Sequence, residues 1–63
     1  ENYEPEEQSI IKLLLENNDP LTIDEIGWRS GVSISKLASF LLNLEIKGVL
    51  SPMPGKVYKI VKV

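Results

Sequence analysis

The side chains best suited to chemistry are small polar and basic groups on one predicted helix, residues 34–47. At its start and along its polar side stand Ser33, Ser35, Lys36, Ser39 and Asn43. In a helix that enters the major groove of DNA, Asn can pair with adenine and Ser with several base edges. The helix has no arginine for the commonest specific contact, which is to guanine. A solvated face chosen for solubility is the alternative explanation.

Basic residues could also contact phosphates without reading bases. The candidates are Arg29, Lys36, Lys47, Lys56 and Lys59. Each neutralised phosphate adds close to one unit to the salt dependence, so a handful of contacts predicts weak binding without sequence preference. Residues 1–25 hold eight acids and one base (net −7), and residues 26–63 hold six bases and one acid (net +5). This asymmetry suggests an acidic and a basic surface, with chance scatter in so short a sequence as the alternative. For the phosphate contacts, scattered surface lysines are the competing explanation.

We find no catalytic or metal-binding pattern in the sequence. It contains neither cysteine nor histidine, which removes thiolate and imidazole chemistry. Ser33-Ile34-Ser35-Lys36 has the letters of the S-x-x-K acylase motif, but the S-D-N and K-T-G elements are missing. The acidic pairs Glu6-Glu7 and Asp24-Glu25 are explained by helix starts. We therefore predict no enzyme, no cofactor, no metal and no small-molecule substrate. No apolar run approaches the ~20 residues of a membrane span, so no membrane partner is expected.

Two aromatic residues are candidates for a protein partner. Trp28 is the only tryptophan and is followed by Arg29, a composition typical of interface hot spots. Trp28 could instead cover the edge of a small core, which is the interpretation we favour. Phe40 lies at the edge of the apolar arc of the third helix, and Ile46 lies among its polar positions. Trp28 and Phe40 are therefore the predicted partner-binding residues.

Three helices are predicted, at about residues 5–16, 23–29 and 34–47. Pro5 suits the first helical position, and Thr22-x-x-Glu25 spells a capping box for the second helix. Ser33 is the predicted cap of the third helix, and Gly48 its stop. The apolar arc of this helix comprises Ile34, Leu37, Ala38, Leu41, Leu42 and Leu44. The predicted core comprises Ile10, Leu14, Ile26, Leu37, Leu41, Leu44, Leu50 and Tyr58 or Ile60.

The pattern changes after the third helix. Residues 49–53 and 56–63 flank Pro54-Gly55, and the second run is rich in β-branched residues, which predicts a β-hairpin. Pro52 should lie on an edge strand because it has no N–H for a ladder. Three helices followed by a hairpin predict an α+β fold, the winged helix-turn-helix.

Four segments together resemble a known family. Residues 20–26, 30–33, 41–50 and 54–58 are similar to the C-terminal winged-helix domain of the DNA-processing protein A (DprA, or Smf) family. The most telling part is the Leu-Leu-x-Leu-Glu-Ile-x-Gly-Val-Leu run from Leu41, joined to a Pro-Gly-x-x-Tyr wing from Pro54. The resemblance covers about residues 6–60. Gly27-Trp28 and Asn43 depart from the residues most frequent in the family.

The resemblance implies a bacterial, cytoplasmic protein of natural transformation, whose relatives bind incoming single-stranded DNA and help load RecA. That activity belongs largely to a preceding Rossmann-like domain. Residues 1–5 would then be a linker end and residues 6–63 an accessory domain. The expected partners are DNA bound weakly, the Rossmann-like domain, another DprA subunit or RecA. The alternatives are a protein-interaction or dimerisation module without DNA binding, and the DNA-binding domain of a transcription regulator.

Overall fold

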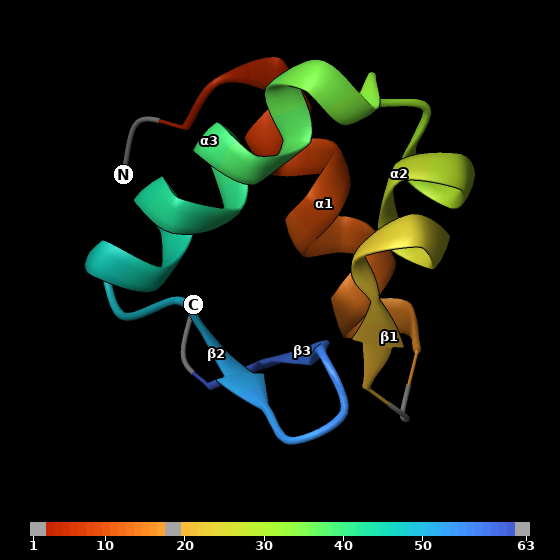
Figure 1. Cartoon of the computed structure of the whole chain (residues 1–63). Helices are drawn as coiled ribbons and strands as arrows, with labels where there is room; N and C mark the ends of the chain where they lie inside the picture. Colours follow the sequence, from red (N-terminus) through yellow and green to blue (C-terminus); the bar gives the residue numbers. More distant parts are fainter. Residues whose placement is uncertain (1–2, 18–19, 62–63) are drawn as a thin grey trace.

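The computed structural model describes residues 3–17 and 20–61, which form three helices above a small antiparallel sheet (Figure 1). In chain order the elements are α1 (Pro5–Glu16), β1 (Leu21–Thr22), α2 (Ile23–Ser30), α3 (Ile34–Ile46), β2 (Leu50–Met53) and β3 (Val57–Ile60). The three helices pack against one another, α1 also contacts β3, and α3 also contacts β2. The predicted α+β winged-helix arrangement is confirmed. Asn18 and Asp19, which follow α1 in the sequence, lie outside the described residues.

The sheet has one strand more than the predicted hairpin. Its order is β1-β3-β2, and β1 pairs antiparallel with β3 through Leu21 opposite Tyr58. The side chain of Leu21 is buried in the core. Pro52 lies on the edge strand β2, as its missing N–H requires. The sheet closes the open end of the three-helix cluster.

The predicted core residues are confirmed, whereas the apolar arc predicted for α3 is too wide. Seven predicted residues are buried: Ile10, Leu14, Ile26, Leu37, Leu41, Leu44 and Leu50. Tyr58 and Ile60 are partly buried against them. The apolar arc of α3 is narrower than predicted, because Ile34, Ala38 and Leu42 are exposed. In so small a domain, α1, α2 and the sheet cover only one side of α3.

The capping box predicted for the start of α2 is present. The Glu25 N–H donates to Thr22 Oγ1 at 3.2 Å, and the Thr22 N–H donates to Glu25 Oε1 at 3.1 Å.

The junction between α2 and α3 depends on small residues. Gly31 ends α2 in the left-handed conformation, with φ +80°. A Cβ atom on Gly27 would lie 3.0 Å from both Ile34 Cδ1 and Leu37 Cδ2. Glycine at position 27 therefore allows the close approach of α3.

The first residues described already belong to the packed domain. Tyr3 packs against the core, and the Glu4 N–H donates to Glu7 Oε1 at 3.0 Å at the start of α1. Pro5 is the first residue of that helix. The division into a linker end at 1–5 and a domain at 6–63 stays a prediction, but residues 3–5 contribute to the fold.

Candidate nucleic-acid interface

The predicted reading face of α3 is exposed along its length. Ser33, Ser35, Lys36, Ser39 and Asn43 are all solvent-accessible. Ser33 is the N-cap residue by position, but its side chain does not bond the helix backbone. Its Oγ lies 3.1 Å from Ser35 Oγ, so the two hydroxyls bond each other. The start of α3 therefore offers hydroxyl groups but only one positive charge, that of Lys36.

Apolar side chains share the outer surface of α3 with these polar groups. Ile34, Leu42 and Ile46 are 60%, 55% and 74% exposed. A helix that reads the major groove gains affinity from donors and charges facing the bases and phosphates. The outer side of α3 therefore matches such a helix only in part.

The wing carries the second group of candidates. Lys56 is in the three-residue turn between β2 and β3, and Lys59 is an exposed residue of β3. Lys56 has φ +61° and is the one non-glycine residue with positive φ among those described. That conformation is strained for an L side chain. No acidic residue occurs after Glu45, so the wing is positive without a compensating carboxylate of its own.

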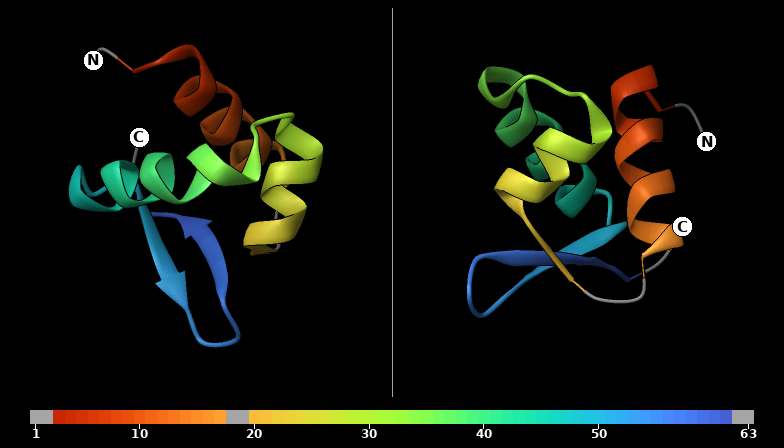
Figure 2. Two further views of the ribbon diagram at one scale, coloured as in Figure 1. Left: turned by 45° about the horizontal axis from the view of Figure 1, so that its top comes forward. Right: turned by 90° about the vertical axis from the view of Figure 1, so that its right-hand side faces the viewer.

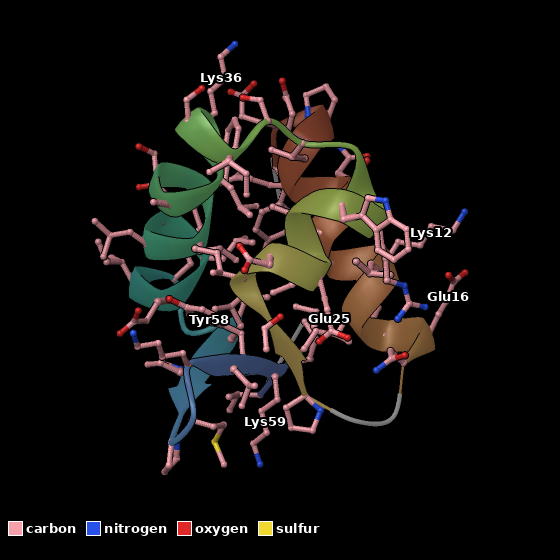
Figure 3. The ribbon with its side chains drawn as sticks, turned by 45° about the vertical axis from the view of Figure 1, so that its right-hand side comes forward. Lys12, Glu16, Glu25, Lys36, Tyr58 and Lys59 are labelled. Atoms are coloured by element: carbon pink, nitrogen blue, oxygen red, sulfur yellow. The ribbon has the colours of Figure 1, made fainter. Side chains whose placement is uncertain are left out.

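The candidate cations do not converge on one surface. Lys36 and Lys59 lie at opposite ends of the molecule (Figure 3). Arg29 faces α1, where its Nη1 donates to Asn17 Oδ1 at 3.4 Å and its side chain lines a shallow groove with Lys12 and Glu16. The candidate cations therefore lie at three separate places: Lys36 on α3, Arg29 beside α1, and Lys56 with Lys59 on the wing. Lys56 and Lys59 are the two that share one structural unit, the hairpin of β2 and β3.

Lys47, a fifth candidate for phosphate contact, is engaged in the fold. Its Nζ lies 3.8 Å from Oε1 of the buried Glu7 and 4.8 Å from the centre of the Tyr3 ring. Sequence reasoning missed this contact, because nothing in the spacing of residues 7 and 47 relates the first turn of α1 to the end of α3. Lys47 is therefore a poorer candidate for phosphate contact than Lys56 or Lys59.

The two aromatic candidates have different surroundings. Trp28 is 84% exposed, so the favoured interpretation that it covers the core edge is wrong. Phe40 is partly buried and packs against the core. Of the two, Trp28 presents the larger apolar surface to a partner.

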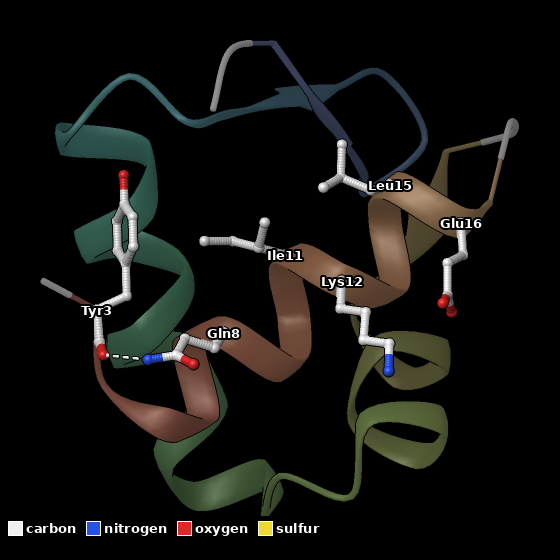
Figure 4. A pocket seen from close by; sticks show the side chains of 6 residues that line it. All are labelled: Tyr3, Gln8, Ile11, Lys12, Leu15 and Glu16. Atoms are coloured by element: carbon white, nitrogen blue, oxygen red, sulfur yellow. Dashed lines mark hydrogen bonds between the residues drawn. The ribbon is translucent and has the colours of Figure 1, made fainter. Parts of the chain in front are cut away.

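Two apolar grooves lie away from Trp28 and Phe40, and Lys56 lines the second of them. One, of about 350 Å³, runs along α1 between Tyr3 and Leu15 and is floored by Ile11 (Figure 4). Gln8 Nε2 donates to the Tyr3 carbonyl oxygen at 2.9 Å at one end of it. The other, of about 390 Å³, lies between Ile23 and the wing residues Met53 and Tyr58. Neither groove has the convergent polar groups that mark a small-molecule site.

Residues 3–17 and 20–61 contain no group of three acidic side chains placed to hold a metal ion. No helix within these two ranges is long and apolar enough to cross a membrane.

Comparison with known protein families matches residues 1–56 to the family described as DprA winged helix domain. Neither the curated proteins nor the solved structures give a match to this chain.

Proposed function

Because this chain belongs to the DprA winged helix domain family, we propose that it is a non-catalytic accessory domain of a DprA-like DNA-processing protein. In this role it makes weak phosphate contacts with DNA through its wing. The parent protein would handle incoming DNA in natural transformation and load RecA. The parent protein would act in the bacterial cytoplasm.

The observation that carries the DNA contact is the conformation of Lys56. Turn positions with positive φ favour glycine, because an L side chain there is strained. A charged side chain that persists in such a position, at the tip of the wing, is a candidate for function. Lys59, exposed on β3, adds a second charge on the same element. The strained backbone of Lys56 and the positive charges of Lys56 and Lys59 favour the wing lysines over the other candidate cations.

The expected contact is weak and independent of sequence. Lys56 and Lys59 are point charges that can neutralise phosphates but do not read base edges. Lys36, Ser33, Ser35, Ser39 and Asn43 of α3, and Arg29 of α2, would contribute only if the DNA also reached those surfaces. Two wing contacts alone predict an affinity that falls with salt by a slope near two.

Chemical-shift mapping of the isotope-labelled domain tests this proposal. A short duplex and a single strand of equal length are titrated separately, each at low and at moderate salt. We expect salt-sensitive shifts at Lys56, Lys59 and the intervening wing amides, with smaller changes along α3. Shifts confined to α3, or none on the wing with either DNA, would contradict the proposal.

A protein partner is the second candidate function, and the exposure of Trp28 favours it. Tryptophan is the residue most enriched at interface hot spots, and this one is 84% exposed. Phe40 could add to such a contact only through the part of its ring that remains exposed. The partner would be the Rossmann-like domain, another DprA subunit or RecA. Shifts at the Trp28 indole on addition of one of these proteins, without DNA, would support it.

A further inference from the structure

The groove beside the wing combines an apolar lining with one lysine. It has a volume of about 390 Å³ and lies between the first residue of α2 and the hairpin of β2 and β3. Both views in Figure 2 show this hairpin projecting beyond the helices, with its turn at the outside of the molecule. We call this hollow the wing groove. Its lining residues are Ile23, Pro52, Met53, Lys56, Val57 and Tyr58.

The lining favours a ligand that is flat and apolar in one part and anionic in another. Met53 and Tyr58, both partly buried, offer a thioether and an aromatic ring, which make favourable contacts with other aromatic rings. Lys56 is exposed, and none of the described residues that line the groove is acidic. Hydrogen-bonding groups do not converge there, as they would in a site for a specific small molecule. The stacking of nucleic-acid bases does not require such groups, because every base has a flat π face.

We propose that the wing groove takes one unstacked base of single-stranded DNA while Lys56 neutralises a phosphate beside that base. This inference rests on the proposed phosphate contact of the wing and adds the class of DNA that the same site prefers. The bases of a duplex are paired and stacked, so one of them could enter the groove only at the cost of unpairing. A duplex therefore gains the phosphate contact alone, whereas a single strand gains stacking as well.

The charges around the groove determine on which side the phosphate lies. Asp24 and Glu25 follow Ile23 on α2, and their carboxylates repel a phosphate from that side. Lys59 extends from β3 away from the helices (Figure 3). Lys56 is thus the one cation among the described residues that line the groove. The phosphate is therefore placed at the turn of the hairpin, with its base directed into the groove.

A comparison of a short thymidine strand with an abasic strand of the same length tests the proposal. The two strands carry the same phosphates, but only one carries bases. At moderate salt the thymidine strand should bind about fivefold more tightly than the abasic strand. Met53 is the only methionine in the sequence, so its isotope-labelled methyl group gives a single NMR signal. The thymidine strand should shift this signal, and the abasic strand should leave it unmoved.

A substitution in the groove separates base stacking from phosphate contact. Met53→Gln removes the thioether without changing the charge, and it should weaken binding of the thymidine strand about threefold. Binding of the abasic strand and of a duplex should stay unchanged. Leu15→Gln is the matched control, because it places glutamine in the other apolar groove, along α1. It should alter none of the three affinities. The methyl signal of the unchanged chain gives an answer even if Met53→Gln disturbs the hairpin.

The possible failures are distinguishable. Equal affinities for the thymidine and abasic strands, with an unmoved Met53 methyl signal, would overturn the inference and leave the phosphate contact of the wing standing. No binding of either strand or of the duplex would overturn both. A methyl signal that moves with protein concentration, but not with DNA, would assign the groove to a second copy of the chain and overturn the inference.

Discussion

The ammonium of Lys47 lies 3.8 Å from a carboxylate oxygen of Glu7, and this contact joins the end of α3 to the first turn of α1. Glu7 is 2% exposed and also accepts the Glu4 N–H at 3.0 Å. A buried carboxylate without such partners would be costly. The pair therefore links the first and third helices, and it draws one lysine of the basic half of the chain into the fold.

We expect Glu7→Ala to lower the free energy of unfolding by about 1–3 kcal/mol, because the Glu4 N–H loses its acceptor and α1 loses a favourable charge at its start. Urea unfolding followed by circular dichroism measures the change. Glu6→Ala removes a neighbouring charge from the same turn without these contacts and should cost less. Equal losses in the two variants would mean that the charge at the helix start, not the contact, stabilises the domain.

The helix caps give a second comparison. Thr22→Ala removes the oxygen that accepts the Glu25 N–H, and it should destabilise the domain by about 1 kcal/mol. Ser33→Ala removes a cap residue whose side chain makes no bond to the backbone of α3, so its effect should be smaller. Thermal unfolding of both variants measures the difference. A loss from Ser33→Ala as large as that from Thr22→Ala would show that the Ser33 hydroxyl caps α3 in solution.

Local signals in the sequence predict the helices well, because caps and stops act within a few residues. Pro5, the Thr22-Glu25 box and Gly48 each mark a boundary that the structure keeps within one residue. The two-residue strand β1 could not be predicted this way. It exists only through its pairing with β3, about 35 residues further along the chain, as the alignment of Leu21 with Tyr58 shows.

Helical periodicity identifies the buried side of α3 but not its width. Leu37, Leu41 and Leu44 are buried because α1, α2 and the sheet all meet that side. Ile34 and Leu42 belong to the same apolar arc by angle, yet nothing described packs over most of either side chain.

The candidate site could be predicted from the sequence only in part, for the same reason. Residue types could be read from the sequence, but the separation of Lys36 from Lys59 is set by the tertiary fold (Figure 3).

Single lysine substitutions should separate wing contacts from general charge. Lys56→Ala and Lys59→Ala should each weaken duplex binding and lower the salt slope by about 0.9. Lys12→Ala removes the same charge from α1, away from the wing, and should leave the slope unchanged. Fluorescence anisotropy of a labelled duplex at several salt concentrations provides the slopes. Equal effects from all three variants would indicate that net charge alone governs binding.

Substitution of Lys56 by glycine should change stability and DNA binding in opposite directions. Positive φ costs an L residue roughly 1–2 kcal/mol, and the freedom of glycine in the unfolded chain offsets part of the relief, so Lys56→Gly should stabilise the domain by up to about 1 kcal/mol. The same change removes the charge at the wing tip and should weaken DNA binding.

Lys56→Ala is the control for this pair of effects, because it removes the charge and keeps the strained backbone. It should weaken DNA binding as much as Lys56→Gly does, with no gain in stability. Urea unfolding and anisotropy on the same three proteins measure both quantities. If Lys56→Gly binds DNA as well as the unchanged chain, the strained lysine serves neither the fold nor the DNA contact, and the argument from its conformation fails.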